Sequence, residues 1–79
     1  MSRSKVERIF QDVLALEPPV DWDGLRYQQV EAWDSLGHMA IVAELEDEFG
    51  ILMETDDIVD MSSFGRALEI LSKYDVDGL

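Results

Sequence analysis

The chain contains no cysteine among its 79 residues. Disulfide bonds, thiolate metal sites and a cysteine nucleophile are therefore excluded. The sequence also shows no apolar run long enough to cross a membrane and no secretory signal pattern. We therefore expect a soluble cytoplasmic protein that does not enter a membrane.

Basic residues are scarce. Six Lys and Arg stand against 18 Asp and Glu, which gives a formal net charge of −12. No Lys or Arg lies between Arg26 and Arg66, an interval that holds ten carboxylates: Glu31, Asp34, Glu44, Glu46, Asp47, Glu48, Glu54, Asp56, Asp57 and Asp60. Such a surface repels nucleic acid and anionic membranes and attracts basic protein surfaces, although it can also serve solubility alone.

The length allows one domain, which we place over residues 1–79, and no internal repeat is visible. Apolar residues recur at helical spacing, which predicts an all-α fold. We expect four helices: residues 4–16, residues 35–49, a short helix capped at Thr55-Asp56-Asp57, and a last helix that follows Ser62 or Ser63 and buries Phe64, Leu68 and Leu71.

The ends of the first helix have local signals. Ser4 and Glu7 have the spacing of a capping box, and Pro18-Pro19 prevents the helix from continuing. The irregular segment 17–33 predicts a long loop that packs Trp22 or Leu25 against the helices. We expect the residues after Tyr74 to fray.

The second helix begins with Asp34-Ser35-Leu36. Asp34 is a good N-cap, because its carboxylate can accept hydrogen bonds from first-turn N–H groups and its charge suits the positive end of the helix dipole. Ser35 then occupies the first helical position with its hydroxyl directed outward. Gly50 is predicted to end the helix.

This motif, the amphipathic helix that follows it, Gly50 and the acidic segment beyond together resemble the acyl carrier protein family, from about Val6 to Tyr74. The resemblance implies a four-helix bundle with a long loop between helices 1 and 2 and a short helix 3. It also implies a protein that is not an enzyme. Ser35, flanked by Asp34 and Leu36, would carry 4′-phosphopantetheine from coenzyme A, and the thiol of that arm would hold an acyl group as a thioester.

The second helix has two apolar faces. Ile41, Val42, Leu45 and Phe49 form the stripe expected to face the core. The opposite strip consists of Leu36, Met39, Ala40 and Ala43, and we predict that it is a docking surface rather than a face covered by the long loop. The resemblance assigns partner docking to Leu36, Met39, Ala43, Glu46, Asp47, Glu48, Asp56 and Asp57.

The residues around the motif depart from those of fatty-acid carriers. Gly37, His38 and Ala40 make the docking face less acidic near Ser35, and Trp33 replaces a small residue. The resemblance implies a carrier for a fatty-acid, polyketide or other secondary-metabolite pathway. The departures argue against service in primary fatty-acid synthesis and favour a specialised, stand-alone carrier. Its expected partners are a phosphopantetheinyl transferase, an acyl- or aminoacyl-loading enzyme and a downstream synthase or transferase. We expect a monomer.

Other interpretations of the same residues remain. A peptidyl or D-alanyl carrier would be loaded by an adenylating enzyme, and a prosthetic-free acidic adaptor would bind a partner helix on the apolar strip. Asp34, Ser35 and His38 lie too close on one helix for a hydrolase triad. His38 is expected to line the point where the arm leaves the helix or to pack beneath the loop. Asp56, Asp57 and Asp60 lack the pattern of a calcium loop, so no metal site is predicted.

Overall fold

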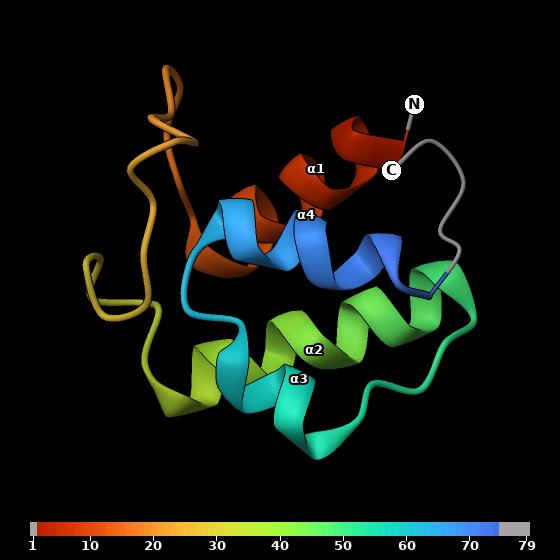
Figure 1. Ribbon diagram of the computed structural model, residues 1–79. Coiled ribbons are helices and arrows are strands. Elements are labelled where there is room, and N and C mark those ends of the chain that lie inside the picture. The colour runs from red at the N-terminus through yellow and green to blue at the C-terminus, as the bar shows by residue number, and fades with distance from the viewer. Residues whose placement is uncertain (1, 75–79) are drawn as a thin grey trace.

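The computed structural model describes residues 2–74 and confirms the all-α prediction for that part of the chain (Figure 1). The predicted fraying beyond Tyr74 lies outside the described residues. None of the described helices is long and apolar enough to span a membrane. Four helices follow one another: α1 (Ser2–Leu14), α2 (Ser35–Phe49), α3 (Thr55–Asp60) and α4 (Phe64–Ser72).

Helix α1 begins and ends two residues earlier than predicted. The capping box at Ser4 is wrong, because Ser4 already lies inside the helix and the Glu7 carboxylate accepts instead from Arg3 Nε at 3.0 Å. Ala15 ends the helix in the left-handed region at φ 53°, and Leu16 N donates to Gln11 O at 3.0 Å. The helix therefore stops before the proline pair.

Helix α2 has the predicted bounds, and both ends have the predicted caps. Asp34 is extended and accepts from Gly37 N, while Gly50 adopts φ 63° and donates to Glu46 O. In α4, Ser63 Oγ accepts from Arg66 N at 3.0 Å, as expected. Helix α3 begins at Thr55, after Glu54, which makes no side-chain cap. The predicted cap at Thr55-Asp56-Asp57 is therefore wrong, because these residues lie inside the helix.

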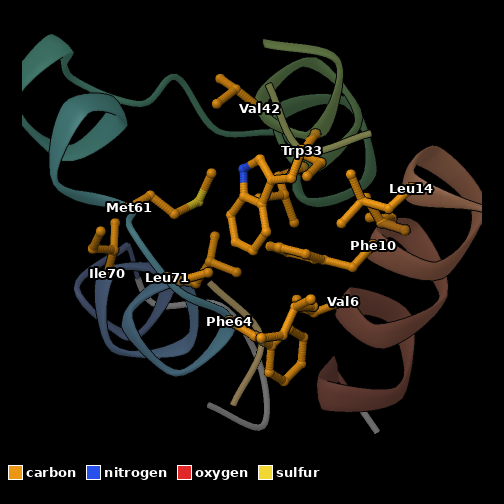
Figure 2. Close-up of a cluster of buried hydrophobic side chains, with 14 of the residues drawn as sticks. Val6, Phe10, Leu14, Trp33, Val42, Met61, Phe64, Ile70 and Leu71 are labelled. Atoms are coloured by element: carbon orange, nitrogen blue, oxygen red, sulfur yellow. The ribbon is translucent and has the colours of Figure 1, made fainter. Parts of the chain in front are cut away.

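The core is built around Trp33 and Phe10, whose rings meet edge to face with centroids 5.3 Å apart (Figure 2). The Phe64 ring also meets the Phe10 ring edge to face, with centroids 5.1 Å apart. Trp33, the residue just before the motif, is 0 % exposed and so serves as a core residue. The remaining buried apolar side chains are Val6, Ile9, Leu14, Leu25, Ile41, Val42, Leu45, Met53, Met61, Ala67, Ile70 and Leu71.

The long loop between α1 and α2 packs against the junction of α3 and α4. Leu25 is buried, and the Trp22 ring lies 4.5 Å from the Phe64 ring, so both predicted loop contacts form. Tyr27 N donates to Ser62 O at 2.9 Å, and Phe64 N donates to Leu25 O at 3.0 Å. These hydrogen bonds fix Tyr27 near the start of α2.

Candidate functional site

Ser35 occupies the first position of α2 and is exposed. The Asp34 cap sets its direction: Oδ1 accepts from Gly37 N at 2.9 Å, and the Asp34 carbonyl accepts from His38 N at 2.8 Å. The first-turn N–H groups lie at the positive end of the helix dipole. An oxygen at Ser35 therefore sits where a negatively charged substituent is stabilised.

Gly37 is required at the start of α2 by a close backbone approach. A Cβ at this position would lie 2.0 Å from the carbonyl oxygen of Ala32. Any side chain would therefore push the segment before the motif away from the helix. The sequence showed Gly37 only as a departure from the fatty-acid carriers, whereas the structure gives it a geometric reason.

Tyr27 reaches the motif from the long loop. Its hydroxyl lies 3.4 Å from Ser35 Oγ, and its ring meets the ring of His38 edge to face at 5.3 Å. Sequence reasoning did not find this residue, because the irregular loop carries no signal that would place Tyr27 beside Ser35. The contact forms only through the pairing of the loop with the segment between α3 and α4.

His38 in α2 contacts Trp33, which precedes the motif, and Ile58 in α3. Its Nδ1 lies 2.9 Å from Trp33 Nε1, and its Nε2 lies 2.7 Å from the carbonyl oxygen of Ile58. The indole N–H can only donate, so Nδ1 accepts and the ring proton resides on Nε2, which donates to Ile58. This pattern corresponds to the Nε2–H tautomer of His38, which connects α2 with α3. Because both ring nitrogens are hydrogen-bonded to other groups, neither is available to Ser35.

A pocket of about 330 Å³ opens between α2 and α3, next to the motif. Ser35 lies on its wall, so a group attached to the hydroxyl starts at the pocket. His38 and the fully buried Met61 also contribute to the lining. Its complete lining is Tyr27, Ser35, His38, Met39, Ile58, Val59, Met61 and Ser62.

The second apolar face of α2 is uncovered. Leu36 is 82 % exposed and Met39 is 52 % exposed, and Ala40 and Ala43 are exposed as well. The long loop packs elsewhere, so it does not cover this strip. Val59 on α3 is 77 % exposed and lines the pocket together with Met39. The sequence pattern did not assign Val59 to this surface.

The predicted acidic docking residues do not share one environment. Asp47 and Asp56 are exposed. Glu48 is exposed too, but its Oε2 lies 3.8 Å from Lys5 Nζ, so it faces α1 rather than the apolar strip. Glu46 is half-buried, and its Oε2 accepts from Met53 N at 2.9 Å, so it also holds the segment between α2 and α3. Within residues 2–74 no group of three or more His, Asp or Glu side chains is placed to hold a metal ion.

The prediction that Asp57 is a docking residue is wrong. It is only 8 % exposed, because it faces the end of α4. Its Oδ1 accepts from Lys73 Nζ at 2.6 Å and its Oδ2 from the Tyr74 hydroxyl at 2.5 Å, and these hydrogen bonds lower the pKa of the carboxyl. Asp57 therefore ties α3 to α4 and is not available to a partner.

These residues together form an exposed hydroxyl at a helix start, an apolar pocket beside it and an apolar strip bordered by carboxylates. Comparison with protein-family models, curated proteins and solved structures gives no match. The function is therefore inferred from this geometry and from the resemblance carried by the motif at residues 34–36.

Proposed function

We propose that the protein is an acyl carrier whose Ser35 hydroxyl is the attachment point for 4′-phosphopantetheine. The observation that carries the proposal is the position of Ser35, exposed at the first residue of α2 and on the wall of an apolar pocket. A serine that only started a helix would have no need of this pocket or of the uncovered strip of α2.

The residues around Ser35 fit a phosphodiester. The first turn of α2 offers N–H groups and a positive dipole end to its negative charge. The Tyr27 hydroxyl, 3.4 Å from Ser35 Oγ, is a further donor close to this oxygen. When attached, the arm supplies the thiol on which an acyl group is carried as a thioester.

Loading is a phosphoryl-group transfer to Ser35. The Ser35 oxygen forms a bond to the phosphorus of coenzyme A that bears the pantetheine, and the bond from that phosphorus to the departing 3′,5′-adenosine bisphosphate breaks. The hydroxyl proton must leave at the same time. His38 is engaged at both nitrogens, so we assign the base to the phosphopantetheinyl transferase rather than to this chain.

The uncovered strip of α2 supports docking of this transferase, the loading enzyme and a downstream synthase or transferase. Leu36 and Met39 form its apolar centre, and the exposed carboxylates of Asp47 and Asp56 supply negative charge. An apolar centre excludes water, while a charged rim steers a basic partner and sets its orientation. We infer that these enzymes present basic residues to this side of the protein.

The proposal is tested by labelling with a fluorescent coenzyme A analogue and a broad-specificity phosphopantetheinyl transferase. We expect labelling of the wild-type protein and no labelling of Ser35→Ala. Ser62→Ala is the matched control, because Ser62 is an exposed hydroxyl on the same pocket. Labelling of Ser35→Ala would overturn the assignment, and binding of partners without any labelling would favour the prosthetic-free adaptor.

A further inference from the structure

Tyr27 contacts Ser35 from outside α2. Its hydroxyl lies 3.4 Å from Ser35 Oγ, and within residues 2–74 it is the one side chain that hydrogen-bonds this oxygen. The neighbouring polar side chains are bound elsewhere, Asp34 to Gly37 N and His38 at both ring nitrogens. Tyr27 is therefore the group that responds directly to a chemical change at Ser35.

The long loop holds Tyr27 in this place with several contacts. Tyr27 N donates to Ser62 O at 2.9 Å, and the next residue, Gln28, donates from its backbone to Trp33 O at 3.0 Å. Gln28 adopts φ 64°, a left-handed conformation that a residue with a side chain keeps only where its surroundings impose it. The Tyr27 ring also packs edge to face against the rings of His38 and Trp33, with centroids 5.3 and 6.2 Å away. The hydroxyl is therefore presented to the motif by a fixed backbone and a fixed ring.

A phosphodiester at Ser35 changes what the Tyr27 hydroxyl can bind. In the free protein, either of the two hydroxyls can donate to the other. Once Ser35 Oγ is bonded to phosphorus it has lost its proton, so only Tyr27 can donate. The unesterified oxygens of the phosphate carry its negative charge and accept hydrogen bonds strongly. Because they are bonded to the same phosphorus as Oγ, they lie within reach of the Tyr27 hydroxyl.

We propose that Tyr27 is a positioning residue, whose hydroxyl donates to the phosphate on Ser35 and so sets the direction in which the arm leaves α2. The presence of that phosphate rests on the proposed function. The Asp34 carboxylate, next to Ser35 in the chain, repels the phosphate and favours its approach to Tyr27. An arm held at its first atoms presents its thiol in fewer directions, which lowers the entropy cost of docking it in a partner enzyme.

Phosphorus NMR of the loaded protein tests this contact. Tyr27→Phe keeps the ring and removes only the hydroxyl, so the phosphorus signal should move away from its wild-type position. Tyr74→Phe is the matched control, because the Tyr74 hydroxyl donates to Asp57 near the end of α4. Its removal should leave the phosphorus signal at the wild-type position.

Thermal unfolding gives a second measure of the same contact. Comparing the free and loaded forms of each protein isolates the coupling between the arm and Tyr27, because the effects of the arm on the rest of α2 cancel. Loading should raise the unfolding midpoint of the wild-type protein by about 4–8 °C more than that of Tyr27→Phe, as one hydrogen bond in a domain of this size predicts. In Tyr74→Phe, loading should have the wild-type effect.

Two results would overturn the proposal. One is a phosphorus signal that Tyr27→Phe does not move, and the other is an equal gain in the unfolding midpoint on loading. If Tyr27→Phe does not fold, the loaded wild-type protein provides the test. Nuclear Overhauser contacts should join the Tyr27 ring protons to the first methylene of the arm, and their absence would contradict the proposal.

Failure of this inference can be distinguished from failure of the proposed function. Phosphoserine incorporated at position 35 places a phosphate there without the transferase. If the protein gains no mass from coenzyme A but its phosphoserine signal depends on Tyr27, the carrier function is refuted and the Tyr27 contact is supported. A gain in mass with a phosphorus signal that does not depend on Tyr27 refutes the contact and supports the carrier function.

Discussion

The indole nitrogen of Trp33 donates to Nδ1 of His38 at 2.9 Å, and this hydrogen bond joins the centre of the core to the candidate site. Trp33 packs on Phe10, while His38 reaches the Ile58 carbonyl and lines the pocket beside Ser35. The packing of α1 and the position of α3 are thereby linked to the pocket. Changes at Trp33 should therefore affect both stability and the site.

Trp33→Phe should destabilise the protein by roughly 2–4 kcal/mol, because it leaves a cavity and removes the donor to His38. The midpoint of thermal unfolding, followed by circular dichroism, should fall by about 4–8 °C for each kcal/mol. Trp22→Phe is the control, since Trp22 is half-buried and packs only at the edge of the core on Phe64. An equal loss of stability in both variants would contradict the central place given to Trp33.

Gly37→Ala and Gly65→Ala should change stability in opposite directions. Alanine normally favours a helix over glycine by about 0.5–1 kcal/mol, and at Gly65 the nearest atom to a new Cβ is Ser63 Oγ at 4.0 Å. At Gly37 the Cβ would overlap the Ala32 carbonyl, so we expect a loss of about 1–3 kcal/mol. Urea unfolding of the two variants measures both values. Stabilisation by Gly37→Ala would show that the close approach to Ala32 does not exist.

The hydrogen bonds that Asp57 accepts from Lys73 and Tyr74 should make the stability of the protein fall in acid. Hydrogen bonds from Lys73 and Tyr74 lower the pKa of Asp57 in the folded state below its ordinary value of 3.8. The contribution of Asp57 to stability is therefore present above about pH 4 and is lost as the pH falls through the lowered folded pKa. Asp57→Asn should be less stable than the wild-type protein at neutral pH, and this difference should shrink in acid.

Unfolding midpoints measured from neutral pH down to about pH 2 test the Asp57 prediction. Asp56→Asn is the matched control, because Asp56 is the exposed neighbour in the same helix. It should cause little loss of stability at neutral pH. A stability difference between the wild-type protein and Asp57→Asn that stays constant across this range would contradict the assigned role of the carboxyl.

Asp47→Lys should slow transfer of the arm to Ser35 without unfolding the protein, because Asp47 is exposed at the rim of the docking strip. We expect Asp47→Lys to lower kcat/KM for the transferase severalfold. For the wild-type protein, kcat/KM should fall as the salt concentration is raised, because salt screens exposed charges. Met39→Glu should act similarly by introducing charge at the apolar centre.

Asp12→Lys makes the same change in net charge on α1, away from the docking strip, and is the control for Asp47→Lys. It should leave kcat/KM close to the wild-type value. Equal effects of both reversals would indicate that only net charge matters. A large loss of stability in Asp47→Lys or Met39→Glu would show that the face is structural.

The parts of the fold that depend on short sequence signals were predictable. Asp34 and Gly50 each determine one end of α2 through their own backbone and side-chain preferences, so its bounds follow from the sequence. The first helix was misplaced because Glu7 pairs with Arg3 and because Ala15, not a glycine, takes the left-handed conformation. The Arg3–Glu7 pair is an ordinary i,i+4 ion pair that competes with the capping box. Only the left-handed Ala15 opposes the usual preference for glycine at this position.

The parts of the site that depend on tertiary contacts were not predictable. Asp57 belonged to an acidic run in the sequence, and only the folded chain brings it to Lys73 and Tyr74, 16 and 17 residues later. The same holds for Tyr27 beside Ser35, and for His38 between Trp33 and Ile58. Residue type indicated which groups could act, but their partners became visible only in three dimensions.

The central claim is tested most directly by the intact mass of the protein before and after incubation with coenzyme A and a broad-specificity phosphopantetheinyl transferase. Fragmentation then locates any added group. The carrier function predicts the gain of one phosphopantetheinyl group on Ser35, or the presence of that group before incubation. A protein that lacks the group at the outset and gains no mass would contradict it.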